Sequence, residues 1–398
     1  MKYLNWIPPT VINIKTPFYL YNEKLILENI QKIKDCFHEQ NYKILYALKA
    51  NSNLKIIKII TNAGLGVDTC SIEEINLSFL CDVNKHEIYY NSDCLTPEEI
   101  DFAIRYKIKL TLGSIDALKY VISKYPGISV ALRINTGIGA GHSDKVITNG
   151  DSSKFGLHIS EVEYAKLLCK SASITICGLH THTGSGEMNI AGYNKNARAL
   201  AEISTKFPNL EFLNFGGGFG FDYKGNEEYN ISGIHKELNK IRSDFNIPDD
   251  LYFIIEPGRY IVANTGVLIS KVSSVKYHPT RNFIGLNTGY NHFPRCFYYG
   301  AWHNILNLTS KDDSFIKYDI VGYLCQSGDI FARDRFLPKT YVGDLVCIMD
   351  VGAYGFSMSS GFNSRVKPGE YLLEENGNVK MIRRPEKFED IVSTFILD

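Results

Sequence analysis

Short apolar runs alternate with amphipathic helical patterns over the first two-thirds of the chain. One helical pattern places four apolar residues at spacings of four, three and four, on a single face: Ile26, Ile30, Ile33 and Phe37. The segment Thr96–Glu99 predicts another helix start, because Thr and Glu at this spacing form a capping box and Pro97 suits the first helical position. Eight runs read as buried strands: Ile44–Leu48, Gly66–Asp68, Glu87–Tyr90, Lys109–Leu112, Ser129–Ile134, Thr175–His180, Glu211–Phe215 and Leu251–Ile255.

Eight strand–helix units in succession indicate an α/β protein with a (β/α)8 TIM-type barrel. Such a barrel usually takes about 250 residues, and the eight units fill a stretch of similar length. A doubly wound parallel sheet is the structural alternative, because it is built from the same units. We expect the barrel to occupy residues 22–265.

The pattern changes after Arg259. Helical periodicity becomes scarce, and Gly, Pro, Asn and Asp separate the apolar runs. The strands expected there are Val267–Tyr277, Phe283–Leu286, Tyr318–Leu324 and Asp344–Val351. An early strand, Phe18–Tyr21, could belong to either domain. We expect residues 1–21 and 266–398 to form a second, β-rich domain.

Composition excludes several classes of protein. Apolar residues make up 44% of the 398 residues and charged residues 22%, which is ordinary globular usage and argues against disorder. The 43 basic and 43 acidic side chains balance, so we expect no nucleic-acid partner. No stretch reaches the roughly 18 apolar residues of a membrane span. The first residues, which include Pro8 and Pro9, lack the apolar core of a secretory signal.

The nine cysteines are widely spaced and include no Cys-x-x-Cys pair. An odd number at such spacing fits neither a disulfide scaffold nor a zinc knuckle. We therefore expect a reducing, cytoplasmic compartment and mostly buried thiols, with Cys325 as an exception.

Polar residues and glycines follow the predicted strands. A (β/α)8 barrel carries its catalytic groups just past the carboxyl ends of its strands. In chain order these positions hold Lys49, Asp68, Asn91, Gly113, Arg133, His180 with His182, Gly216–Gly218, and Glu256 with Arg259. We expect them to share one rim of the barrel.

Lys49 and the two histidines are the first candidates for chemistry. An apolar setting lowers the pKa of a lysine, and a neutral amine can form a Schiff base; the alternative is a surface lysine that ends a strand. His180 and His182 alternate along a strand, so both rings would face one side. No nearby carboxylate or Cys completes a metal site. We expect one ring to stack on a planar cofactor, the other to be a core histidine, and no metal.

Two further segments suggest a phosphate-bearing ligand. The glycines of Gly216–Gly220 follow a strand, where backbone N–H groups can approach a phosphate, although a tight turn is the alternative. The segment is neither a dinucleotide fingerprint nor a P-loop. Arg259 could hold a phosphate and Glu256 a protonated ring nitrogen, unless they form only a salt-bridged loop. A lysine, a glycine loop, a carboxylate and an arginine on one rim match the groups that bind pyridoxal 5′-phosphate (PLP).

These residues resemble the diaminopimelate decarboxylases, which are fold-type III, alanine racemase-like PLP enzymes. The resembling segments follow the order of that family nearly end to end: Thr16–Tyr21, Tyr46–Asn51, Ser153–Gly156, Gly178–Gly186, Gly216–Gly220, Glu256–Arg259, Cys325–Asp329 and Gly352–Gly355. The resemblance implies a barrel whose active site is completed by a C-terminal β-barrel or β-sandwich domain.

The resemblance also implies the site residues. Lys49 would bind the cofactor covalently, and Cys325 would act as the general acid that returns a proton to the α-carbon after CO2 leaves. The implied cofactor-binding set is Lys49, Asp68, Arg133, His182, Ser185, Gly217, Gly218, Glu256, Arg259 and Tyr354. Within it, His182 would stack on the pyridine ring and Glu256 would pair with the ring nitrogen. In this family the cysteine comes from the neighbouring subunit, so a homodimer with shared active sites is implied.

The implied substrate is meso-2,6-diaminopimelate, decarboxylated to L-lysine and CO2 in lysine biosynthesis. Arg295 and Tyr299 match family residues that bind the distal end of this substrate. An arginine suits a distal carboxylate, which lysine and ornithine lack. The expected substrate-binding set is Arg259, Arg295, Tyr299, Gln326 and Tyr354.

The sequence departs from the family pattern around the distal site. Gln326 stands where the family has Glu, and a neutral amide binds an ammonium without full charge assistance. The other departures are Asn287 and His292 for Asp, Cys296 and Val366 for proline, and Phe362 for tyrosine. The main alternative is therefore a PLP-dependent decarboxylase of a related amino acid in a specialised pathway. A further alternative is a non-catalytic, decarboxylase-like PLP-binding protein. A racemase is the last alternative, and the Cys325–Asp329 segment disfavours it.

Overall fold

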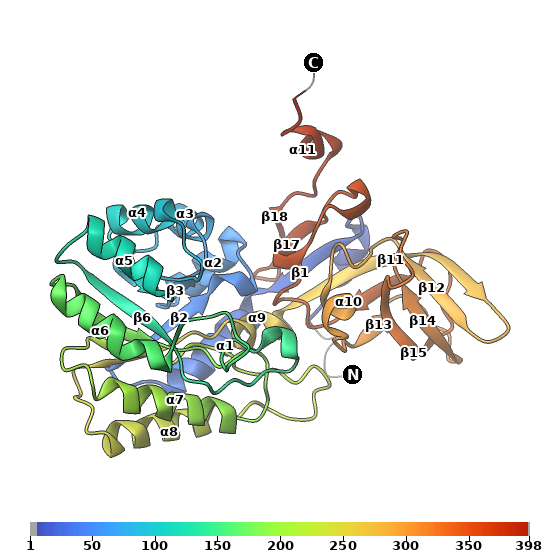
Figure 1. Cartoon of the computed structure of the whole chain (residues 1–398). Coiled ribbons are helices and arrows are strands. Elements are labelled where there is room, and N and C mark those ends of the chain that lie inside the picture. Colours follow the sequence, from blue (N-terminus) through green and yellow to red (C-terminus); the bar gives the residue numbers. More distant parts are fainter. Residues whose placement is uncertain (1–5, 397–398) are drawn as a thin grey trace. The chain divides into compact units, whose positions relative to one another are not determined.

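The computed structural model describes residues 6–396 and divides into two units (Figure 1). One unit contains Asn29–Asp222 and Glu227–Tyr260. The other contains the described residues up to Glu28, together with Tyr223–Asn226 and the chain from Ile261 onward. Within residues 6–396, no helix is both long enough and apolar enough to cross a membrane.

Eight parallel strands close into a barrel in the first unit. They follow chain order around the barrel, and the last strand pairs with the first through Phe253 and Tyr42. The strands are β2 (Tyr42–Ala47), β3 (Gly66–Thr69), β4 (Ile88–Asn91), β5 (Lys109–Leu112), β6 (Ser129–Asn135), β8 (Thr175–His180), β9 (Phe212–Asn214) and β10 (Tyr252–Ile255). A short strand, β7 (Leu157–His158), pairs with β6. The predicted (β/α)8 fold is confirmed. Both ends of each predicted barrel strand lie within two residues of the ends of an observed strand.

Helices precede, connect and follow the barrel strands. They are α1 (Glu23–Cys36), α2 (Leu54–Asn62), α3 (Ile72–Leu80), α4 (Pro97–Tyr106), α5 (Ile115–Lys124), α6 (Val162–Ser171), α7 (Ala191–Ser204), α8 (Ile231–Asp244) and α9 (Arg259–Val262). The predicted capping box starts α4, where Thr96 and Glu99 each accept the backbone N–H of the other. The predicted apolar face of α1 is buried, with Ile26 and Ile33 fully inaccessible.

Apolar side chains from several strands fill the barrel interior. Leu45, Tyr89, Ala131 and Phe212 come from β2, β4, β6 and β9 and pack in one apolar cluster. Gly178 on β8 leaves the space that the Phe212 ring occupies, because a Cβ atom there would overlap the ring. The interior is therefore a packed core, and the polar residues at the carboxyl ends of the strands lie above it on one rim.

A nine-stranded mixed sheet forms the main part of the second unit. Its strands are β1 (Phe18–Asn22), β11 (Gly266–Tyr277), β12 (Asn282–Leu286), β13 (Ile305–Asn307), β14 (Phe315–Val321), β15 (Ile330–Pro338), β16 (Leu345–Ile348), β17 (Gly369–Leu373) and β18 (Val379–Arg383). The path runs β15-β14-β12-β11-β1-β17-β18, with β16 pairing β11 and β13. The early strand β1 thus belongs to this sheet, antiparallel to β11 and parallel to β17. Two short helices complete the unit: α10 (Arg295–Tyr299) and α11 (Phe388–Val392).

All nine cysteines are free thiols. The buried ones are Cys81, Cys169, Cys177, Cys296 and Cys347. Cys36 and Cys70 are half-buried, whereas Cys94 and Cys325 are exposed. Cys325 is therefore one of two accessible thiols, and it lies on the segment between β14 and β15.

Candidate active site

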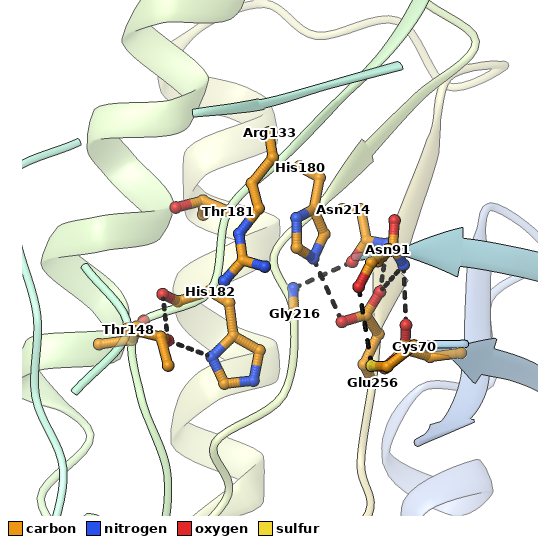
Figure 2. A network of polar contacts seen from close by, with 12 residues as sticks. Cys70, Asn91, Arg133, Thr148, His180, Thr181, His182, Asn214, Gly216 and Glu256 are labelled. Carbon is orange, nitrogen blue, oxygen red and sulfur yellow. Dashed lines mark hydrogen bonds and ion pairs between the residues drawn. The ribbon is translucent and has the colours of Figure 1, made fainter. Parts of the chain in front are cut away.

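A buried carboxylate pair lies at the carboxyl ends of β3 and β10. Glu256 is 2% exposed, and one of its oxygens accepts hydrogen bonds from Asn91 Nδ2 at 2.7 Å and Asn214 Nδ2 at 2.6 Å. Its other oxygen lies 3.3 Å from His180 Nε2, as Figure 2 shows. Asn91 Nδ2 also donates to Asp68 Oδ1 at 2.9 Å. One amide therefore connects both carboxylates.

The two carboxyl groups differ in proton affinity. Burial alone would raise the pKa of Glu256, but its neighbours His180, Lys49 and His182 lower it to about 2. For Asp68, burial and the charge of Glu256 together raise the pKa, against the opposing effect of Lys49. Glu256 is accordingly an anion at neutral pH.

Lys49 follows β2 directly, and its Nζ lies 2.8 Å from Asp68 Oδ2. The setting of Lys49 is not apolar as expected, because the buried carboxylate of Asp68 pairs with the amine. Cys70 Sγ lies 3.6 Å from the same Nζ. Burial raises the pKa of the Cys70 thiol to about 12, so this sulfur remains a neutral neighbour of the amine.

His182 lies two residues beyond the end of β8, and its ring is held at one nitrogen. The backbone N–H of Gly184 donates to Nδ1 at 3.2 Å, and the Thr148 hydroxyl lies 2.9 Å from the same atom (Figure 2). Because a backbone amide can only donate, Nδ1 is the acceptor and the ring proton belongs on Nε2. Burial, together with the charge of Lys49, holds the pKa of His182 well below its usual range, so the ring is neutral.

Arg133, near the end of β6, is held by a carboxylate. Its Nη1 forms an ion pair with Asp93 Oδ2 at 2.8 Å, and its guanidinium lies 4.5 Å from the centre of the Phe155 ring. Asp93 also accepts the backbone N–H of Gly156 at 3.0 Å. In Figure 2 the guanidinium points toward His182. Arg133 is therefore a fixed positive charge on the rim.

The glycines after β9 pack against two other rim segments. A Cβ atom at Gly217 would overlap the carbonyl oxygen of Glu256, and one at Gly218 would lie 2.5 Å from the carbonyl oxygen of Gly184. Gly218 also has a φ of +97°, which favours glycine. Beside this loop, Arg259 Nη2 donates to Ser185 Oγ at 3.0 Å. Backbone, guanidinium and hydroxyl together form a region suited to an anion.

The remaining predicted residues belong to the second unit. Cys325 contacts the side chain of Asn363, and Gln326 Oε1 lies 2.5 Å from the Tyr290 hydroxyl. The Tyr290 ring stacks on Phe297 with the ring centres 4.3 Å apart. Tyr290 and Phe297 therefore form part of the surroundings of Gln326.

Arg295 lies on α10 and is only 1% exposed. Its Nη1 lies 2.8 Å from His303 Nε2, and its guanidinium lies 4.2 Å from the centre of the Tyr223 ring. Tyr299 ends the same helix and is half-buried. Tyr354 follows β16 with a positive φ of 56° and is also half-buried. Arg295 is thus held in place by aromatic and imidazole neighbours.

Two of the departures from the family pattern have structural partners. Asn287 Nδ2 donates to Thr16 Oγ1 at 3.0 Å. His292 is 2% exposed, with Nδ1 at 2.9 Å from the Thr288 hydroxyl and Nε2 at 3.0 Å from the carbonyl oxygen of Val366. Both side chains therefore contribute to packing within the second unit.

The sequence matches known proteins over both units. The family model described as pyridoxal-dependent decarboxylase, pyridoxal binding domain, matches residues 23–263. The diaminopimelate decarboxylase of Methanothermobacter thermautotrophicus is 33% identical over 394 residues, covering 95% of this chain and 91% of the relative. The chain belongs to the diaminopimelate decarboxylase family of pyridoxal-dependent decarboxylases. It is a PLP-dependent enzyme, as the resemblance in the sequence implied.

Other members of the diaminopimelate decarboxylase family agree with this assignment. The Escherichia coli K12 enzyme is 30% identical over 401 residues, covering 96% of this chain and 94% of the relative. The crystal structure of the Helicobacter pylori enzyme complexed with L-lysine has a TM-score of 0.89 and 31% identity, and the match covers 96% of both chains.

The barrel rim fits PLP by its own geometry. Lys49 supplies an amine, and the low pKa of Glu256 supplies a stable anion for a protonated ring nitrogen. At Gly217 and Gly218 the backbone is packed too closely for a Cβ atom, as expected of a loop whose N–H groups contact a phosphate. A negative group in that region would meet the Arg259 guanidinium and the Ser185 hydroxyl.

The strand-end rule missed several groups that hold the rim together. Asp93 pairs with Arg133, and Thr148 holds His182, yet both lie in loops. Asn214 ends β9, but the sequence prediction singled out only the glycines that follow it. Its position at the carboxyl end of a strand is the signal that could have found it.

Proposed function

We propose that this protein decarboxylates meso-2,6-diaminopimelate to L-lysine and CO2 in lysine biosynthesis. The observation that carries the proposal is the match of 95% of the chain, across both units, to a diaminopimelate decarboxylase. A member of the family was solved with L-lysine, the product expected of this reaction. The rim of the barrel supplies the matching cofactor chemistry.

We assign the cofactor-holding roles to residues of the barrel. Lys49 would hold the cofactor covalently through Nζ, with Asp68 orienting the amine. When bound, PLP supplies a ring that accepts the electron pair of the bond that breaks. Glu256, as an anion, would hold a proton on the ring nitrogen, and the neutral His182 ring would cover one ring face.

The phosphate group would be held beside the glycine loop. Its partners would be the backbone N–H groups of Gly217 and Gly218, the Ser185 hydroxyl and the Arg259 guanidinium. Arg133 would not contact the phosphate in this scheme. As a fixed cation near His182, it would keep that ring neutral.

Proton return is assigned to Cys325. The thiol is exposed, as a group that serves a second subunit would be before assembly. We propose a homodimer in which Cys325 of one subunit completes the site of the other, with Tyr354 close to cofactor and substrate. Tyr290, Phe297 and Phe362 form an aromatic cluster beside the Cys325 segment, and Phe297 and Phe362 are exposed. Exposed aromatic rings of this kind favour an interface between subunits.

Distal recognition is assigned to Arg295 and Tyr299, with Gln326 and Arg259 as further substrate contacts. The test is CO2 release from meso-diaminopimelate, lysine, ornithine and arginine by the PLP-loaded enzyme. We expect turnover of diaminopimelate alone. Good turnover of another amino acid, with none of diaminopimelate, would reject the proposed substrate.

Two variants distinguish the proposed enzyme from a non-catalytic, PLP-binding protein. Lys49→Ala should abolish both the visible absorbance of the bound cofactor and CO2 release, because the covalent attachment is lost. Cys325→Ala should keep the absorbance but lower turnover by about a hundredfold or more, since the general acid is lost. Absorbance without turnover in the unmodified enzyme, for every amino acid tested, would indicate the non-catalytic alternative.

A specific contact favours the second candidate, a decarboxylase of a related amino acid. The oxygen of Gln326 accepts from the Tyr290 hydroxyl at 2.5 Å, so the group that remains for a ligand is the amide NH2, which can only donate. A donor at this position suits a distal group that accepts hydrogen bonds better than an ammonium. Gln326→Glu should therefore improve turnover of diaminopimelate if that amino acid is only a secondary substrate.

The compartment is also part of the proposal. The nine free thiols agree with a reducing environment, and we propose a cytoplasmic location. Fractionation of cells that carry the tagged full chain would test it.

A further inference from the structure

Asn363 contacts Cys325 in three ways. The backbone N–H of Cys325 donates to Asn363 Oδ1 at 3.2 Å, and Asn363 Nδ2 lies 3.0 Å from Cys325 Sγ. In the third contact, the Cys325 thiol donates to Asn363 Oδ1 at 3.3 Å. The two residues are 38 positions apart in the chain, so the loop that carries Asn363 is folded against the Cys325 segment.

The orientation of the Asn363 amide follows from these contacts. A backbone N–H can only donate, so the atom it meets must be the amide oxygen. The NH2 group is then the atom that faces the sulfur, and it can only donate. Cys325 Sγ therefore accepts a hydrogen bond from the side chain of Asn363.

We propose that Asn363 is a positioning residue that stabilises the Cys325 thiolate formed when the thiol gives up its proton. This inference rests on the proposed function, because it takes Cys325 as the proton donor. In that step the S–H bond breaks, the proton forms a C–H bond at the α-carbon, and the electron pair of the S–H bond stays on sulfur.

The contribution of Asn363 grows during this step. Before transfer, the thiol donates a weak hydrogen bond to Oδ1, which is given up with the proton, and Nδ2–H meets a neutral sulfur, which is a weak acceptor. After transfer it meets an anion, and a hydrogen bond to a charged group is about twice as strong as a neutral one. An interaction that strengthens along the reaction lowers the barrier, whereas one of constant strength does not.

The backbone at Asn363 decides which variants are informative. Its φ of 56° and ψ of 24° lie in the left-handed region, which asparagine, aspartate and glycine tolerate best. Asn363→Asp keeps the size and the oxygen that accepts from Cys325, but replaces the donor with an anionic oxygen. Asn363→Gly keeps the backbone conformation and removes the side chain. Ser364→Gly is the matched control, because Ser364 has a φ of 54° in the same loop.

The first measurement is alkylation of the holoenzyme by iodoacetamide, followed by peptide mass spectrometry. Only the thiolate reacts, so the rate at a fixed pH reports its population. We expect Asn363→Asp to slow the alkylation of Cys325 by about tenfold. Cys94, the other exposed thiol, should react at an unchanged rate and serves as the internal reference. Ser364→Gly should leave both rates unchanged.

The second measurement is a double-mutant cycle on turnover. Asn363→Asp should lower kcat by about tenfold with little change in KM, and Asn363→Gly should have a smaller effect. In the Cys325→Ala background, Asn363→Asp should cause no further loss, because its partner is gone.

The outcomes separate the inference from the proposed function. Unchanged turnover in Cys325→Ala would reject the role of Cys325 itself. A slow Cys325→Ala enzyme, together with normal alkylation and turnover in Asn363→Asp, would reject only the role of Asn363. Equal losses from Asn363→Asp in both backgrounds would show a general structural effect and would also overturn the inference.

Discussion

The side-chain amide of Asn91 donates hydrogen bonds to both buried carboxylates of the barrel, Asp68 and Glu256. Asn214 adds another donor to the same oxygen of Glu256. Against the effect of burial, His180 and Lys49 hold the pKa of Glu256 low and keep it ionised, whereas burial and the charge of Glu256 raise the pKa of Asp68. In the proposed function, Glu256 would face the ring nitrogen, whereas Asp68 contacts the lysine amine.

The charge of Glu256 can be tested with its neutral isostere. Glu256→Gln keeps the shape but removes the anion, so we expect PLP to remain bound and kcat to fall by about a hundredfold. Cofactor absorbance and CO2 release measure the two effects. Glu211→Gln, at the opposite end of the barrel strands, is the matched control and should behave as the unmodified enzyme. A normal kcat in Glu256→Gln would show that a neutral partner of the ring nitrogen is sufficient.

His292 gives the protein a defined acid sensitivity. Burial lowers its pKa from 6.5 to about 4, so the unfolded chain takes up the proton at a higher pH than the folded chain does. The stability that the neutral ring contributes is therefore present above pH 6.5 and is lost as the pH falls toward 4, by about 3 kcal/mol at most. His292→Gln should flatten the decline of Tm over this range.

The control for this prediction is His86→Gln, because His86 is an exposed histidine. We expect its Tm to fall with pH as steeply as that of the unmodified protein. The same steep decline in His292→Gln would show that the acid sensitivity arises elsewhere.

At the scale of the elements, the loop after β9 tolerates few substitutions at its glycines. A Cβ atom at Gly217 would overlap the carbonyl oxygen of Glu256, so Gly217→Ala must shift the loop or the residue it touches. We expect at least a tenfold weaker affinity for PLP, measured by titration of the apoenzyme, because the N–H groups lose their alignment. Gly361→Ala should retain normal affinity, since Gly361 has a φ of −90° and nothing lies within 4 Å of its Cβ position. Equal affinities in the two variants would contradict the proposed phosphate loop.

The barrel strands were predictable because parallel strands covered on both faces read as continuous apolar runs. β3, β4 and β9 are short and fully buried, and all three were found. β15 was missed because Arg333, Asp334 and Arg335 interrupt its apolar pattern on an exposed part of the sheet. β18 was missed for a similar reason, since it is largely exposed. Edge strands have fewer buried positions, so hydrophobicity alone marks them poorly.

The site was predictable where topology fixes it. Lys49, Asp68 and Glu256 end strands of one barrel, so the fold brings them together whatever the loops do. Asp93, Thr148 and Asn363 lie in loops, and their partners are set by tertiary packing that no local pattern records. The setting of Lys49 was mistaken for the same reason, because the residues before it in the sequence are apolar while its nearest charged group lies 19 positions away.

At the scale of the whole molecule, the proposed dimer predicts complementation between two inactive variants. Lys49→Ala lacks the amine and Cys325→Ala lacks the acid, so each homodimer should be nearly inactive. A mixed dimer would contain one intact site of two, so mixed dimers purified through both tags should show about half of the normal activity. The measurement is CO2 release from co-expressed, differently tagged subunits purified through both tags. Activity no higher than that of the separate variants would show that Lys49 and Cys325 act within one subunit.

The first strand of the chain, β1, is flanked in its sheet by strands made far later. Phe18 lies opposite Ile269 on one side and Gly369 on the other. On the ribosome one edge of this apolar strand can pair once β11 has been made, but its other edge stays open until β17 has been made, when almost all of the protein has been synthesised. Messages truncated before residue 369 would release chains whose central β1 edge is open, and such chains are candidates for chaperone capture or aggregation.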